Sequence, residues 1–97
     1  MKEKNIPNCL KRHRRARGLQ QKDVAKVLRL KSASMISRWE KGFCLPNTRN
    51  LFKLAILYRT MSDALFIDLI KQMRNDIQKR EQGILRKDAE IKKGRSK

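Results

Sequence analysis

Residues 34–42, S-M-I-S-R-W-E-K-G, place the chain's one tryptophan between a cation and an anion. The guanidinium of Arg38 can donate two parallel hydrogen bonds to the edge of a guanine, or contact a phosphate. The carboxylate of Glu40 would repel a phosphate, so another group must neutralise it. Ile36 and Trp39 are three residues apart and share a helical face. We therefore expect both to be buried, with the tryptophan anchoring its helix rather than stacking on a base.

The chain is strongly basic. Its 97 residues include 26 Lys and Arg against 9 Asp and Glu, for a formal net charge of +17. So much positive charge on a small chain predicts a polyanionic partner, most often nucleic acid. An acidic membrane surface or an acidic protein would also satisfy the charge. Residues 1–66 carry 16 of the basic and 4 of the acidic side chains, so most of the excess lies in that part.

Few side chains are of the types that catalyse reactions or bind metals. Cys9 and Cys44 lack the paired spacing of a zinc site, and His13 is the one histidine, so we expect reduced thiols, a half-buried imidazole and no metal or cofactor. There is no nucleophile–base pair, acidic metal cluster or phosphate-binding glycine loop, which argues against an enzyme. No apolar stretch is long enough to span a membrane and the first residues do not form a signal peptide, so we expect a cytoplasmic protein.

Glycine and proline divide the first part of the chain into short helical segments, and no segment alternates as a strand. We expect one helix over about residues 9–17, a second that begins near Gln21 and a third over 33–41. A fourth is expected to follow the N-cap Thr48, and a fifth to follow the N-cap Ser62. The helix over 33–41 has Ser32 as its expected N-cap and Gly42 as its terminator. Five short helices predict a compact all-α domain, in which the second and third form a helix-turn-helix.

The C-terminal part follows another pattern. Isoleucines recur every seven residues, as in a coiled-coil seam, at Ile70, Ile77, Ile84 and Ile91. The companion positions are apolar at Met73 but basic afterwards, and Gly83 interrupts the row. We therefore expect a helix to about residue 82, followed by a basic and partly disordered end. This extension could help the chain to dimerise or could pack on its own domain.

Two ordered motifs carry a family resemblance. The run R-x-x-x-G-L-x-Q-x-x-V-A-x-x-L extends from Arg14 to Leu28. I-S-R-W-E-K-G follows from Ile36 to Gly42, and then come Pro46 and L-F-K-L-A. This arrangement resembles the Xre/Cro-type helix-turn-helix family, the lambda-repressor-like DNA-binding domains.

The resemblance covers about residues 8–70, which it implies to be a five-helix lambda-repressor-like domain. Outside it we expect a basic arm at 1–7 and, at 71–97, a helical extension with a basic, partly disordered tail. Three features differ from the family's usual pattern. Arg29 stands where a glycine commonly follows the second helix. Gln20 replaces the usual Ser or Thr, and the link between the second and third helices is one residue longer.

The resemblance also implies which residues meet DNA. The third helix, about 33–41, is expected in the major groove, where Arg38 would pair with guanine or, alternatively, hold a phosphate. The residues expected at the DNA are Gln21, Ser32, Ala33, Ser34, Met35, Ser37 and Arg38. The residues expected to support them are Ile36 and Trp39 in the core, and Arg14 and Glu40 as an ion pair between the first and third helices.

The leading function is therefore sequence-specific binding of double-stranded DNA by a small regulator of prokaryotic or phage type, as a homodimer on a palindromic operator. Two alternatives stay open. One is an antitoxin or anti-regulator module that acts mainly through a protein partner, docked on the C-terminal helix. The other is a nonspecific nucleic-acid-coating protein.

Overall fold

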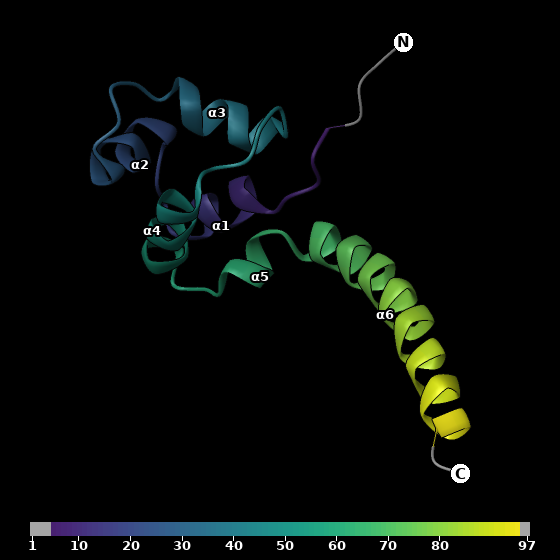
Figure 1. Ribbon diagram of the computed structural model, residues 1–97. Coiled ribbons are helices and arrows are strands. Elements are labelled where there is room, and N and C mark those ends of the chain that lie inside the picture. Colours follow the sequence, from purple (N-terminus) through teal and green to yellow (C-terminus); the bar gives the residue numbers. More distant parts are fainter. Residues whose placement is uncertain (1–4, 96–97) are drawn as a thin grey trace.

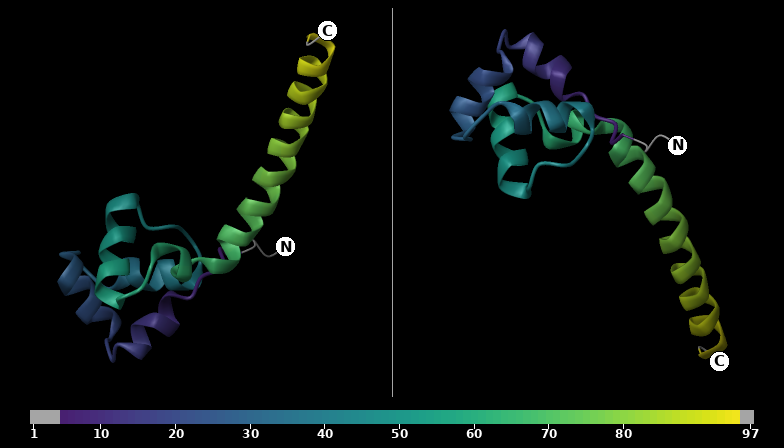
Figure 2. Two further views of the ribbon diagram at one scale, coloured as in Figure 1. Left: turned by 90° about the horizontal axis from the view of Figure 1, so that it is seen from below. Right: turned by 90° about the horizontal axis from the view of Figure 1, so that it is seen from above.

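The computed structural model describes residues 5–95, and their side chains as far as residue 86; this part of the chain is all α-helical, without a strand (Figure 1). The helices are α1 (Leu10–Ala16), α2 (Gln21–Leu28), α3 (Ser34–Lys41), α4 (Thr48–Tyr58), α5 (Ser62–Leu65) and α6 (Ile67–Arg95). Helices α1 to α5 gather into one body, and α6 projects away from it (Figure 2). The expected all-α class is confirmed. Lys2 and Lys4 of the expected basic arm lie outside the described residues.

One hydrophobic core joins the first five helices. Helix α2 packs against α3 and α4, α1 packs against α3, and α5 packs against α4. Each helix contributes side chains from one apolar face, and burying each large one stabilises the fold by roughly 1.5–3 kcal/mol. The buried apolar residues are Leu10, Val24, Ala25, Leu28, Ile36, Trp39, Leu54, Tyr58, Leu65 and Phe66.

Four helices end in the same backbone motif, in which a residue just past the helix takes the left-handed conformation. These residues are Gly18 (φ 70°), Arg29 (φ 60°), Gly42 (φ 79°) and Arg59 (φ 55°). In each case the next amide donates to the carbonyl five residues back, in the pairs Leu19–Arg14, Leu30–Ala25, Phe43–Arg38 and Thr60–Ala55, at 2.8–3.2 Å. Two of the four ends thus use arginine where glycine would be unstrained.

Two expected N-caps are wrong by one residue. Thr48 and Ser62 are the first residues of α4 and α5 rather than their caps. Helix α4 is capped by Asn47, whose Oδ1 accepts a hydrogen bond from the amide of Asn50 at 2.8 Å. Asparagine caps at least as well as threonine, and it comes first in the chain. Met61 holds the cap position of α5 in an extended conformation, without a side-chain hydrogen bond.

The single long helix expected after Ser62 is in fact two helices. Helix α5 ends at Leu65, and Phe66 leaves the helical path (φ −131°, ψ 43°) before α6 begins. This break lets the core take up Leu65 and Phe66 while α6 leaves in another direction (Figure 1).

The expected end of the last helix near residue 82 is also wrong. Helix α6 continues through Gly83 to Arg95. One glycine inside a helix costs about 1 kcal/mol, which does not end it. Residues 96 and 97 of the expected disordered tail lie outside the described part. None of the described helices is long and apolar enough to cross a membrane.

Candidate nucleic-acid interface

Helices α2 and α3 form the helix-turn-helix, and they pack on each other across a turn that begins at Arg29 (Figure 1). Arg29 takes the left-handed conformation, with φ 60° and ψ 44°. This is the position at which the sequence departs from the usual glycine. The amide of Leu30 donates to the carbonyl of Ala25 at 2.8 Å, so the arginine makes the turn that a glycine would make, at a cost in backbone strain.

The start of α3 differs from the expectation. Ser32 was expected as the N-cap, but α3 begins at Ser34 and Ala33 holds the cap position. The Ser32 hydroxyl accepts a hydrogen bond from the Ser34 amide at 3.3 Å, and the two hydroxyls lie 2.7 Å apart. The helical ladder begins where the Ser37 amide donates to the carbonyl of Ala33 at 3.1 Å. The longer turn therefore ends one residue later than predicted, and both exposed serine hydroxyls lie at the entrance to α3.

Helix α3 has one buried face and one exposed face, as the spacing of its residues predicts. Ile36 and Trp39 are 1% and 2% exposed, so their predicted burial is confirmed. The indole Nε1 has no hydrogen-bond partner among the described residues, so tryptophan acts here as apolar volume. The outward residues Ser34, Met35 and Arg38 are exposed, and Ala33 and Ser37 are half-buried.

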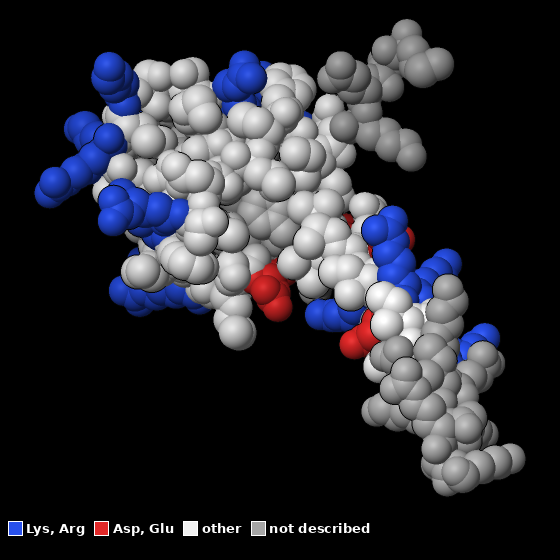
Figure 3. Space-filling view, viewed as in Figure 1, with Lys and Arg blue, Asp and Glu red and all other residues white. Residues whose placement is uncertain are grey.

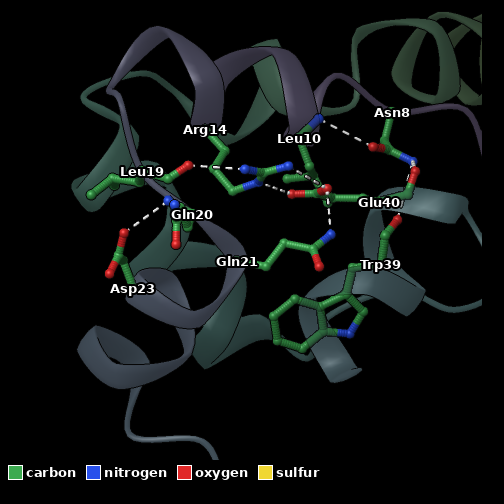
Figure 4. Close-up of polar contacts among 9 residues, drawn as sticks. All are labelled: Asn8, Leu10, Arg14, Leu19, Gln20, Gln21, Asp23, Trp39 and Glu40. Atoms are coloured by element: carbon green, nitrogen blue, oxygen red, sulfur yellow. Dashed lines mark hydrogen bonds and ion pairs between the residues drawn. The ribbon is translucent and has the colours of Figure 1, made fainter. Parts of the chain in front are cut away.

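A buried polar network ties α3 to α1 and α2 (Figure 4). Arg14 donates from Nε to Oε2 of Glu40 at 2.6 Å and from Nη2 to Oε1 at 3.1 Å. Its Nη1 donates to the carbonyl of Leu19 at 2.9 Å, and Gln21 donates from Nε2 to Oε1 of Glu40 at 3.0 Å. The ion pair that the resemblance implied is therefore present, and Gln21 joins it from the first turn of α2.

This network balances the negative charge of Glu40, the one carboxylate of α3, inside the protein. The side chains of Arg14 and Glu40 are 10% and 4% exposed, so a charge left alone there would be costly. The hydrogen bonds that Arg14 donates to Glu40 raise the pKa of Arg14 above its ordinary value, against the opposing effect of burial. Glu40 is thus neutralised within the protein, and a nearby phosphate would meet no free negative charge from it.

Asn8 has a structural role that sequence reasoning missed. Its Nδ2 lies 3.2 Å from the carbonyl oxygens of both Trp39 and Glu40, and its Oδ1 accepts a hydrogen bond from the amide of Leu10 at 3.1 Å (Figure 4). The same Nδ2 also lies 3.1 Å from the carbonyl oxygen of Ile6. One amide group thus joins the start of α1 to the last turn of α3. An Asn just before a helix is a local capping signal, but no local signal reports its partners on α3.

Basic side chains surround this motif. Lys and Arg side chains project around the α2 and α3 side of the molecule, and the acidic ones visible in the same view lie towards α5 and α6 (Figure 3). The exposed basic residues of the helix-turn-helix are Lys22, Lys26, Arg29, Lys31, Arg38 and Lys41. The acidic residues there are Asp23, which accepts a hydrogen bond from the amide of Gln20 at 2.9 Å, and the neutralised Glu40. The motif therefore presents a positive surface to a ligand.

The described residues contain no group of three His, Cys, Asp or Glu side chains that could hold a metal ion. Among known proteins, a helix-turn-helix family matches the chain over residues 10–63, which covers α1 to the start of α5. No curated protein and no solved structure matches it.

Proposed function

Because the chain belongs to the DNA-binding helix-turn-helix family of lambda-repressor-like regulators, we propose that it recognises specific sequences of double-stranded DNA. In this proposal it is a small, non-enzymatic transcriptional regulator of prokaryotic or phage type. It acts in the cytoplasm as a homodimer on a palindromic operator. Helix α3 enters the major groove, as the second helix of such motifs does.

The observation that carries the proposal is the way in which α3 is held. Its inner face is fixed by Ile36 and Trp39 in the core, and its last turn by Glu40, through Arg14 and Gln21. Its outer face is exposed to solvent and carries the hydroxyl of Ser34, the thioether of Met35 and the guanidinium of Arg38. A rigid helix with an exposed polar face can read base edges without losing much conformational entropy on binding.

Within this surface we assign roles by exposure and chemistry. Arg38 can pair with guanine O6 and N7, and Ser34 can bond several base edges. Met35 can contact a thymine methyl group, and the half-buried Ala33 and Ser37 lie close enough to the outer face to complete it. The exposed hydroxyl of Ser32, at the entrance to α3, suits a phosphate or a base edge.

We do not assign Gln21 to the recognition of bases. Its amide nitrogen donates to Glu40, so this donor is held inside the protein. Its backbone amide belongs to the first turn of α2, where unpaired N–H groups favour a phosphate. We therefore assign Gln21 to the DNA backbone and to the support of α3.

Selection of bound duplexes from a random pool tests this proposal. We expect a palindromic consensus, and a binding constant that falls with salt with a log–log slope of about −0.9 for each phosphate contact. Salt-dependent binding without any enriched sequence would instead identify a nonspecific coating protein. Failure to bind duplexes at any salt concentration would contradict the proposal and leave the protein-partner role.

A further inference from the structure

The last turn of α3 is held by one side chain from outside the helix-turn-helix. The final carbonyls of a helix have no partner in a following turn, so they must find one elsewhere. Among the described residues no backbone amide donates to the carbonyl of Glu40, and Nδ2 of Asn8 lies 3.2 Å from it. The same Nδ2 lies 3.2 Å from the carbonyl of Trp39 (Figure 4). We refer to this contact as the Asn8 clamp.

The amide group of Asn8 is itself held on both sides. Its nitrogen carries two hydrogens, and one competing acceptor, the carbonyl of Ile6, lies 3.1 Å away in its own segment. At least one hydrogen is therefore left for α3. Its oxygen accepts from the amide of Leu10 at 3.1 Å, and Leu10 is buried in the core. Such a turn fixes an asparagine side chain against its own backbone.

The backbone that carries Asn8 is also fixed. The amide of Cys9 donates to the carbonyl of Leu65 at 2.8 Å, and Leu65 is the fully buried last residue of α5. The carbonyl of Cys9 accepts from the amide of His13 in α1 at 3.1 Å. The clamp therefore joins α3 to two helices, α1 and α5, that lie outside the helix-turn-helix.

The network of Arg14 and Gln21 does not replace the clamp. It binds the carboxylate of Glu40, at the end of a side chain with several rotatable bonds. Asn8 contacts the main chain, so it fixes the end of the helix axis directly. Helix α3 has 8 residues and is roughly 12 Å long at 1.5 Å per residue. In so short a helix, a small shift of the last turn changes the tilt of the whole.

We propose that Asn8 is a positioning residue for base recognition, which it supports through Arg38 without contacting DNA. The inference rests on the proposed function, in which Arg38 reads a base pair. Arg38 directly precedes the clamped residue Trp39, and a bidentate contact needs both of its hydrogen bonds aligned. Functional side chains must be held within about 0.5 Å of their working geometry. Ser34 lies at the other end of α3, so its contacts depend less on the clamp.

Asn8→Asp tests the proposal because it removes little besides the donor. The carboxylate has the same shape and still accepts from the amide of Leu10, but it has no hydrogen to donate to α3. Asn47→Asp is the matched control. The oxygen of Asn47 accepts from the amide of Asn50 at 2.8 Å, and its nitrogen donates no hydrogen bond among the described residues. Both variants add one negative charge, which lowers affinity for all duplexes alike and leaves their relative preference unchanged.

Binding to single-base variants of the selected operator is the first readout. Asn8→Asp should reduce the preference at the base pair that Arg38 reads roughly tenfold, and the preference elsewhere less than about twofold. Asn47→Asp should leave every preference unchanged. Asn8→Ser, which is uncharged and has no amide group, should reproduce the loss. In an Arg38→Ala background Asn8→Asp should have no further effect at that base pair. An equal loss at all positions, or additive effects of the two changes, would overturn the inference.

Amide hydrogen exchange tests the clamp without DNA. The amides of Gly42 and Phe43 donate to the carbonyls of the last turn of α3, at 3.0 Å each. In Asn8→Asp they should exchange roughly tenfold faster. The amide of Thr60, at the corresponding end of α4, should keep its rate. Equal acceleration at both ends would indicate general destabilisation and overturn the inference.

The two proposals fail in different ways. A wild-type chain that binds no duplex would overturn the proposed function. A wild-type chain that binds a consensus with the same base preferences as a folded Asn8→Asp variant would overturn this inference alone. Circular dichroism shows that each variant is folded at the temperature of the binding measurement.

Discussion

The amide of Ile6 donates to the carbonyl of Gly42 at 2.8 Å, so the segment before α1 lies directly on the residue that ends α3. Gly42 is buried and has φ 79°. A Cβ atom placed on it would meet the carbonyl oxygen of Ile6, and would lie 2.7 Å from its amide nitrogen. Two independent constraints therefore require glycine at this position: the left-handed backbone and the close approach of another segment.

Gly42→Ala should lower the free energy of unfolding by about 3 kcal/mol, from left-handed strain plus a backbone clash. Gly18→Ala is the matched control: Gly18 has φ 70°, but nothing lies within 4 Å of its added Cβ. It should cost only about 1–2 kcal/mol. Urea denaturation measures both values. Equal losses would show that the segment before α1 moves aside freely.

Arg14→Ala should lower the free energy of unfolding by about 3–5 kcal/mol, because it leaves the Glu40 carboxylate buried without its cation. The double variant Arg14→Met/Glu40→Leu removes both charges and keeps apolar volume, so it should lose much less than the two single changes together. A double-mutant cycle by chemical denaturation measures this coupling. Strict additivity would contradict the interpretation of Arg14 and Glu40 as one buried unit.

Arg29→Gly should stabilise the domain by about 1 kcal/mol, since it relieves the left-handed strain of a residue with a Cβ. Arg29 is exposed and donates no side-chain hydrogen bond among the described residues. Lys53→Gly serves as the control, because Lys53 is exposed inside α4, where glycine should cost about 1 kcal/mol. Thermal denaturation at low ionic strength compares the two. A destabilised Arg29→Gly variant would mean that the arginine makes a favourable contact that outweighs its strain.

Burial raises the pKa of the Tyr58 phenol above its ordinary value, and the negative charge of Glu40 raises it further. The folded protein therefore holds the proton more tightly than the unfolded chain does. The stability that this provides is fully present below pH 10, the unfolded pKa, and is lost as the pH rises beyond it. Tyr58→Phe removes this loss, so the difference in unfolding free energy between the variant and the wild type should grow in favour of the variant above pH 10. A difference independent of pH would contradict the raised pKa.

Arg38→Ala should relax the preference at one base pair of each half-site and leave the other positions nearly unchanged. A bidentate contact to guanine contributes roughly 1–3 kcal/mol of discrimination. Binding of wild type and variant to a set of single-base operator variants measures the change. Lys41→Ala is the control, because a phosphate contact should weaken binding to all sequences alike and reduce the salt slope by about one. A uniform loss for Arg38→Ala would place Arg38 on the phosphate backbone.

The sequence by itself determined the features that depend on local spacing. The burial of Ile36 and Trp39 follows from positions three residues apart, and the ends of α1 and α3 follow from the freedom of Gly18 and Gly42 at positive φ. The exposed isoleucine row of α6 was visible as a seven-residue repeat. Each of these signals lies within a few turns of one helix, so it needs no knowledge of the rest of the chain.

Only the tertiary structure decided what depends on distant segments. The clamp of Asn8 on Trp39 and Glu40 joins residues more than thirty positions apart, and the close approach to Gly42 comes from the segment before α1. The break at Phe66 exists because the core can take up that ring while α6 leaves the domain. Arg29 adopts a glycine's conformation because the packing of α2 against α3 outweighs the strain in one residue. Such balances are set by contacts across the fold, which spacing along the chain does not report.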